Sequence, residues 1–168
     1  MQKRINSYVL QIIAESAGTK GEGVYLIDLK VQDSLRVRKI EVIVDTDTGI
    51  SIDQCAWLNR RLRERLESNE QIGEDFELTV SSPGLGAPII LPRQYIRHCG
   101  KLMKVTYSHD DVQVGFKGRL LRTLLSEESR LSIVMMPEKR KKKSDQFTAE
   151  EITIYLHKVI CAVPEVEL

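Results

Sequence analysis

The chain has 168 residues, of which 42% are hydrophobic, enough for one large or two small soluble domains. No apolar run approaches the ~20 residues that a membrane-spanning helix needs, and the 3 cysteines are too widely spaced for a disulfide framework or a zinc ribbon. Residues 1–92 carry 11 basic and 14 acidic side chains, a net charge of −3, whereas residues 93–168 carry 14 and 10, a net charge of +4. These features predict a cytoplasmic protein without a metal or a cofactor.

Two helices and three strands are predicted in the first half. The first helix has one apolar face and would end at Gly18. That face comprises Ile5, Tyr8, Val9, Ile12 and Ile13. Two strands, 25–31 and 40–44, alternate apolar and polar residues around a turn at Asp33-Ser34. Ser51 and Gln54 have the spacing of a capping box and predict the start of a second helix. Its expected buried stripe comprises Ile52, Cys55, Leu58, Leu62 and Leu66.

A third strand is predicted over residues 76–81, where Phe76, Leu78 and Val80 alternate with polar residues. The element order is therefore αββαβ. A three-stranded sheet covered on one face by two helices is the compact arrangement of that order.

The segment after this strand contains two prolines and two glycines within residues 83–88. Proline removes a backbone donor and glycine permits positive φ, so neither a strand nor a helix continues here. The composition favours a semi-rigid joint between two domains. A long hairpin loop within one domain is the alternative.

Residues 80–85, Val-Ser-Ser-Pro-Gly-Leu, together with Pro88, resemble the linker signature of the RimP family, the bacterial ribosome maturation factors. Residues 44–56 resemble the acidic strand-turn-helix segment of the same family. The chain departs from the family pattern at Gly86-Ala87, where relatives usually carry Asp-Arg. The resemblance covers the whole chain and is weakest after Val105.

The second half contains short β-rich runs separated by polar turns, which predicts a small barrel. The runs are 102–107, 112–121, 131–136 and 151–159, with turns at 109–111 and 126–129. Gly115 and Gly118 would let a strand bend at a barrel corner. The family resemblance implies an SH3-like barrel. The predicted fold class is thus α+β, with an αββαβ domain at 1–82, a linker at 83–92 and the barrel at 93–168.

Catalysis is not expected, because the chain has no P-loop, GxSxG, HExxH or GxGxxG motif. Ser81 and Ser82 fit turn chemistry better than a nucleophile, since hydroxyls before Pro-Gly satisfy turn backbone groups. His98, Cys99 and His109 have no recognised metal-ligand spacing.

Asp45, Asp47 and Asp53 form an acidic cluster around Gly49. Their residue types suit turn and cap chemistry, and they also suit a contact surface. The family resemblance implies that this surface meets a basic small-subunit ribosomal protein, uS twelve. The joint residues Ser81, Ser82, Pro83 and Gly84 are included in the predicted partner-binding set.

Five consecutive cations, Lys139, Arg140, Lys141, Lys142 and Lys143, are the clearest candidate for a phosphate contact. A solvated hairpin tip is the alternative, and no aromatic residues interleave with them. Arg60, Arg61, Arg63 and Arg65 are weaker candidates, because Arg60–Glu64 and Arg63–Glu67 have the spacing of helical ion pairs.

The resulting hypothesis is a monomeric, non-enzymatic factor that binds the immature small ribosomal subunit through uS twelve and rRNA and assists its maturation. It would have no small-molecule substrate and no membrane association. A general RNA-binding regulator and a small hydrolase acting through Ser82 are the rival hypotheses.

Overall fold

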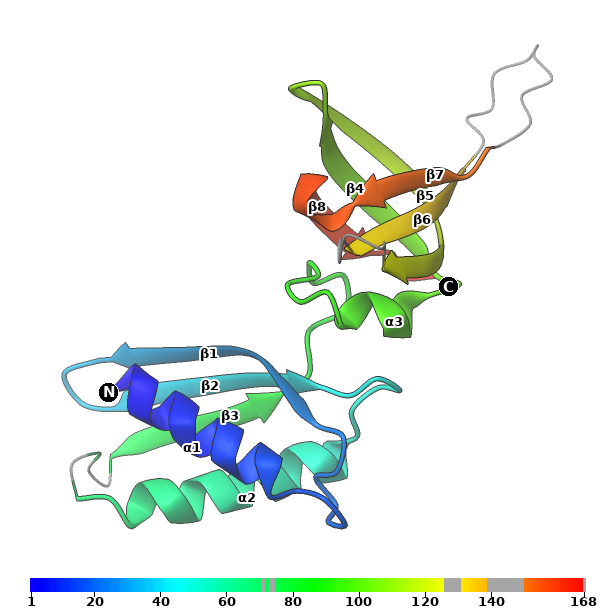
Figure 1. Ribbon diagram of the computed structural model, residues 1–168. Coiled ribbons are helices and arrows are strands. Elements are labelled where there is room, and N and C mark those ends of the chain that lie inside the picture. Colours follow the sequence, from blue (N-terminus) through cyan, green and yellow to red (C-terminus); the bar gives the residue numbers. More distant parts are fainter. Residues whose placement is uncertain (71, 73–74, 126–130, 139–149, 168) are drawn as a thin grey trace. The chain divides into compact units, whose positions relative to one another are not determined.

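A computed structural model describes residues 1–70, 72, 75–125, 131–138 and 150–167 of the chain. The chain divides into two compact units, Met1–Pro83 and Gly84–Leu168, each built around one sheet (Figure 1). The predicted α+β class is therefore confirmed. Within the described part of the chain, no helix is long and apolar enough to cross a membrane.

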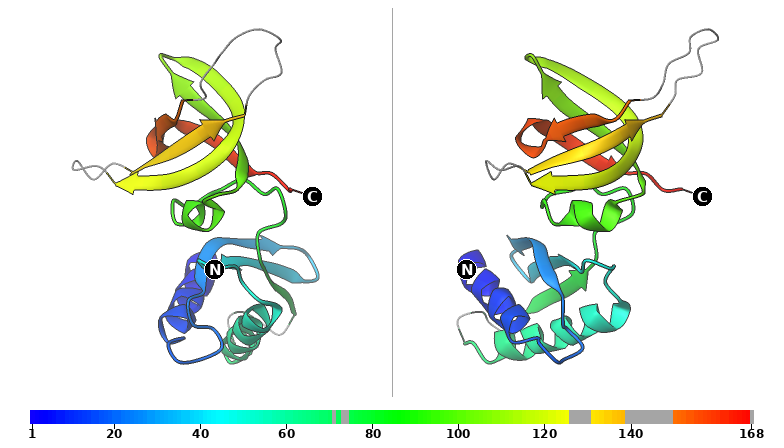
Figure 2. Two further views of the ribbon diagram at one scale, coloured as in Figure 1. Left: turned by 90° about the vertical axis from the view of Figure 1, so that its right-hand side faces the viewer. Right: turned by 45° about the vertical axis from the view of Figure 1, so that its right-hand side comes forward.

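The first unit has the predicted order αββαβ. Its elements are α1 (Gln2–Ala14), β1 (Tyr25–Asp33), β2 (Arg38–Asp45), α2 (Ile52–Glu67) and β3 (Phe76–Ser81). Strand β2 is central, antiparallel to β1 and parallel to β3. The parallel pair requires a crossover connection, which α2 supplies. Both helices lie on the same side of the sheet (Figure 2).

The core of the first unit lies between the helices and the sheet. Each helix and the central strand contribute fully or nearly fully buried aliphatic residues, namely Ile5, Val9, Ile12, Ile40, Val42, Val44, Leu58, Leu62 and Leu66. This set contains most of the predicted helical stripes. Because α1 and α2 pack on this shared core, their outward-facing side chains are held in a fixed arrangement.

Two predictions about the helices of the first unit are wrong in detail. Ile52 is 87% exposed and does not belong to the buried stripe. It is the first residue of α2, where an apolar side chain need not yet lie over the sheet. Helix α1 ends at Ala14, where the Glu15 amide bonds to Gln11 O, and Gly18 lies in the turn that follows.

The second unit is a curved, fully antiparallel sheet with a short helix (Figure 2). Its elements are α3 (Gln94–His98), β4 (Leu102–His109), β5 (Val112–Leu125), β6 (Leu131–Pro137), β7 (Ile152–Tyr155), the 3₁₀ helix η1 (Leu156–Lys158) and β8 (Val159–Pro164). The strand order is β7-β6-β5-β4-β8. The ladders formed by the described residues do not join β7 to β8, so they show a sheet and not a closed barrel.

The β4–β5 hairpin turns at Asp110-Asp111, as predicted, with φ of 48° and 61°. Positive φ at both central residues is the geometry of a type I′ turn. Gly118, one of the two predicted bend positions in β5, lies close to the neighbouring strand β6, because an added Cβ would lie 2.6 Å from Met136 O. At Gly115 the nearest atom would be 3.6 Å away, an ordinary contact.

The run 151–159, predicted as one strand, is instead β7, η1 and the start of β8. Strand β7 pairs with β6 at one end of the sheet and β8 pairs with β4 at the other, so the chain must turn between them. The prediction also missed α3. Its Gln94 is 3% exposed, and Gln94 Oε1 accepts from the Ile90 and Leu91 amides, both at 2.8 Å.

Candidate functional site

Asp45 organises the turn at the end of β2. Its Oδ1 accepts from the amide of Thr46 at 2.8 Å and from the amide of Ile50 at 3.2 Å. Gly49, with φ of 100°, lets the chain reverse between those two amides. The Asp45 carboxylate is therefore used within the turn and is buried.

The other two aspartates of the cluster lie on the surface. Asp47 is exposed in the turn, and Asp53 is exposed in the first turn of α2. The predicted capping box is confirmed: Ser51 Oγ accepts from the Gln54 amide at 3.2 Å, and Gln54 Oε1 accepts from the Ser51 amide at 2.9 Å. Asp53 also complements the positive end of the helix dipole. The outward-facing acidic surface thus consists of Asp47 and Asp53, supported from within by Asp45.

Cys55 lies on α2 near this turn. Burial, and secondarily the negative charge of Asp45, raise the pKa of its thiol. A raised pKa keeps the thiol protonated and makes it a poor nucleophile or metal ligand. Among the residues that the structure describes, no group of three or more His, Cys, Asp and Glu side chains could hold a metal ion.

The joint residues occupy the end of the first unit and the start of the second. Ser81 is the last residue of β3 and pairs with Ile43 of β2. Ser82 and Gly84 are exposed, and Pro83 is half-buried. The Ala87 amide donates to Gly84 O at 3.0 Å, and the Ile89 amide donates to Ala162 O at 2.8 Å. Ile89 is thus hydrogen-bonded to β8 of the second unit.

The cationic run Lys139–Lys143 lies outside the described residues. The elements that flank it in the sequence, β6 and β7, are antiparallel neighbours, with Met135 opposite Ile152.

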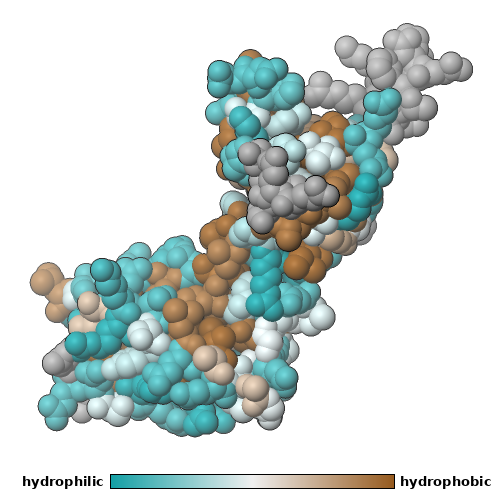
Figure 3. All heavy atoms as spheres, in the orientation of Figure 1, coloured by the Kyte–Doolittle hydropathy of each residue, from teal (hydrophilic) through white to brown (hydrophobic). Residues whose placement is uncertain are grey.

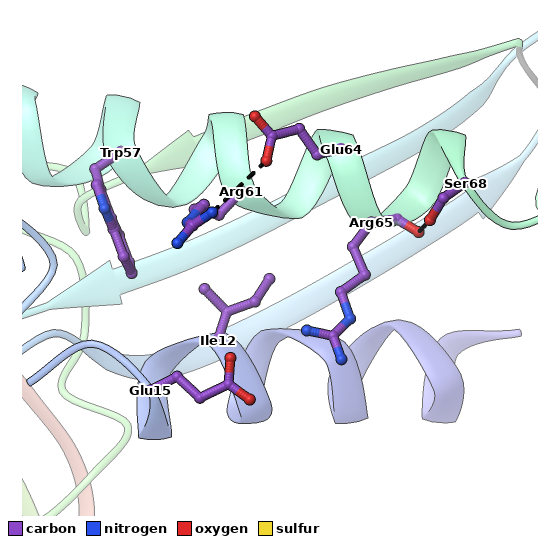
Figure 4. Close-up of a pocket in the computed structure, with 7 residues that line it drawn as sticks. All are labelled: Ile12, Glu15, Trp57, Arg61, Glu64, Arg65 and Ser68. Carbon is purple, nitrogen blue, oxygen red and sulfur yellow. Dashed lines mark hydrogen bonds and ion pairs between the residues drawn. The ribbon is translucent and has the colours of Figure 1, made fainter.

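A groove between α1 and α2 was not predicted. The outer surface of α2 is mostly hydrophilic (Figure 3), and the groove beside it has a volume of about 320 Å³. Figure 4 shows its lining side chains: Ile12 of α1 and Glu15, which caps that helix, and Trp57, Arg61, Glu64 and Arg65 of α2 with its cap residue Ser68.

Ion pairs along α2 differ in part from those predicted. The Arg63–Glu67 pair is confirmed at 3.7 Å, but Glu64 pairs with Arg61, at 3.9 Å, and not with Arg60. Arg65 reaches across the groove, where its Nη2 donates to Gln11 Oε1 at 2.8 Å. Helical spacing rules describe contacts within α2 and cannot reveal a contact with α1.

Comparisons with known proteins agree on one family. The model of the RimP N-terminal domain matches residues 12–86. The chain is 53% identical to the ribosome maturation factor RimP of Pelodictyon phaeoclathratiforme, with all of both chains covered. It is 49% and 47% identical to the proteins of the same name from Chlorobium phaeobacteroides and Chlorobium phaeovibrioides, again with complete coverage of each chain.

Proposed function

The chain belongs to the RimP family of ribosome maturation factors, and we propose that it acts as an assembly factor of the small ribosomal subunit in the cytoplasm. The similarity to relatives named ribosome maturation factor RimP over their full length is the observation that carries this proposal. The function is recognition of the immature subunit, with no chemical reaction and no cofactor. The protein acts as a monomer.

The acidic surface around Asp47 and Asp53 is the proposed contact for the basic ribosomal protein uS twelve. Both carboxylates are exposed and lie at the start of α2, a rigid element held by a complete capping box. Complementary charge would steer the encounter and set the register. Asp45 contributes by holding the turn that presents Asp47.

The second unit is the proposed rRNA-binding domain, with Lys139–Lys143 as its phosphate contact. Each phosphate contacted on single-stranded RNA steepens the fall of log K with log salt concentration by about 0.7. A sheet of five antiparallel strands with a close approach at Gly118 is compatible with the SH3-like barrel that the family resemblance implies. We place the domains at 1–82 and 93–168, with 83–92 as the joint. Ser81, Ser82, Pro83 and Gly84, at the boundary between the first domain and the joint, are proposed to contact the partner.

Sedimentation of a cell extract through a sucrose gradient tests the proposal. The protein should travel with free small subunits and not with translating ribosomes, and deletion of its gene should cause precursor rRNA to accumulate. A protein found only with polysomes, or a deletion strain with normal subunit ratios and rRNA ends, would contradict it.

A general RNA-binding regulator is the second candidate function, favoured by the cationic run. It predicts equal affinity for arbitrary RNA and no preference for the small subunit. A hydrolase acting through Ser82 predicts substrate turnover that Ser82→Ala abolishes.

A further inference from the structure

Arg65 is held in place by neutral groups. Its guanidinium donates to Gln11 Oε1 and lies 5.6 Å from the centroid of the Tyr8 ring, while the Tyr8 hydroxyl accepts from Asn69 Nδ2 at 2.7 Å. Within the described residues, no carboxylate forms an ion pair with it. The side chain is therefore ordered before any partner arrives, and it keeps its charge and most of its five donors available.

Two exposed arginines of the second unit, in contrast, are neutralised. Arg119 and Arg122 in the second unit each donate two hydrogen bonds to one carboxylate, with closest N–O distances of 2.7 Å to Glu167 and to Glu151. A bidentate pair of this kind neutralises the charge of the guanidinium and uses two of its N–H donors, so neither is available to a phosphate.

The groove places an aromatic ring in line with two guanidinium groups. Trp57, Arg61 and Arg65 follow one another at four-residue intervals, which is about 6 Å per step along α2. The Trp57 ring is fixed against Gly21, where an added Cβ would lie 2.2 Å from the ring. Arg61 is 58% exposed and has only the long Glu64 contact at 3.9 Å.

We propose that this groove binds a short stretch of single-stranded RNA, with a phosphate on Arg65 and Arg61 and a base against Trp57. The proposal rests on the proposed function and adds an rRNA contact in the first unit. Guanidinium groups suit phosphate and carboxylate alike, but a neighbouring aromatic ring favours a nucleotide. Glu15 and Glu64 also line the groove and would repel a long run of phosphates, so the ligand is a single strand of few nucleotides and not a duplex.

Trp57 is the only tryptophan of the chain, so its fluorescence reports on this groove alone. The test titrates the full-length protein with a short oligoadenylate labelled for anisotropy and follows both signals. Binding should quench Trp57 saturably. Arg65→Gln should raise the dissociation constant seen by Trp57 severalfold and reduce the salt slope by about 0.7, the value for one phosphate on a single strand. Arg65→Lys, which retains the charge without the fork, should have a smaller effect.

Arg122→Gln is the matched control, because it removes the same charge from an exposed arginine that Glu151 already neutralises. It should change neither the midpoint nor the slope. Trp57 fluorescence that stays constant while anisotropy saturates would overturn the inference, as would equal effects of Arg65→Gln and Arg122→Gln. Quenching by an oligoglutamate peptide but not by RNA would also overturn it, in favour of an acidic protein partner. If the wild-type protein still co-sediments with small subunits in these cases, the proposed function stands and only the groove assignment fails.

Discussion

In the ranges that the structure describes, arginines of both units pair with carboxylates, among them Arg61 and Arg63 in the first unit, but Arg65 of the first unit does not. In the first, Arg63 and Arg65 lie 5.3 and 5.6 Å from the centroids of the Phe76 and Tyr8 rings. In the second, Arg119 and Arg122 face carboxylates. Because residues 84–92 carry no charge, the first unit has the net charge of −3 and the second that of +4. Net charge is therefore a poor guide to available charge: the acidic unit keeps an ordered, uncompensated arginine, and the basic unit pairs two of its own.

The cores differ as well, since helices cover the first sheet and the second sheet curves over its own side chains. Leu62→Ala removes a side chain that is 0% exposed between α2 and the first sheet. Loss of burial and the remaining cavity should lower the free energy of unfolding by about 2–5 kcal/mol. Urea unfolding followed by Trp57 fluorescence measures this effect in the first unit. Leu10→Ala, at a position 49% exposed on α1, should cost far less, and equal losses would show that the core lies elsewhere.

The close contact between the backbones of β5 and β6 at Gly118 provides the next test. Gly118→Ala would place a Cβ 2.6 Å from Met136 O, and backbone atoms cannot move as a side chain can. Strain of this kind costs about 1–3 kcal/mol. Gly115→Ala in the same strand meets only ordinary contacts and serves as the control. Thermal unfolding of both variants measures the difference. Similar melting temperatures would show that the close approach at Gly118 causes no strain in the alanine variant.

Local patterns predicted most of the first unit. Alternation at Phe76, Leu78 and Val80 and the Ser51–Gln54 capping box depend on neighbours within a few residues, so sequence spacing reveals them. The prediction that Ile52 is buried was wrong because an apolar residue in the first turn of a helix need not lie over the sheet. Sequence reasoning grouped Asp45, Asp47 and Asp53 as one acidic cluster, but it could not tell that only Asp45 is buried.

Contacts between distant residues account for what was missed. Gln11 and Arg65 are 54 positions apart, and no spacing rule joins them. The break after Tyr155 follows from a change of partner strand, from β6 to β4, which local β propensity does not record. Helix α3 has only five residues, too few for a clear apolar period.

Substitutions in the acidic surface should have a smaller effect than substitutions in the core, and the effect should be on binding. Asp47→Asn combined with Asp53→Asn should slow association with purified uS twelve severalfold, because charges at the rim of an interface act mainly on the association rate. The amide side chains retain the size of the originals. Asp75→Asn, an exposed aspartate of the same unit, is the control. Stopped-flow kinetics at low salt measures the rates, and a double variant as fast as the control would remove these aspartates from the proposed contact.

Asp45→Asn tests whether Asp45 acts by holding the turn that carries Asp47 or through its own negative charge. An asparagine oxygen can still accept from the amides of Thr46 and Ile50, so the turn should persist and the association rate should change less than in the double variant.

The smallest effect concerns the neutralised arginines of the second unit. Hydrogen bonds from Arg122 and Arg119 lower the pKa of Glu151 and of Glu167, respectively, below the ordinary 4.5. A carboxyl group whose pKa is lower in the folded than in the unfolded protein stabilises the fold above the unfolded value. This contribution is lost as pH falls through the folded pKa. The loss should therefore occur below pH 4.5, and it should be slight because both pairs are exposed. Carbon-detected NMR titration of the carboxyl groups should show the pKa of Glu151 rising in Arg122→Gln while that of Glu167 stays unchanged. An unaltered Glu151 pKa would mean that Arg122 is not neutralised in solution, and the contrast with Arg65 would then lose its basis.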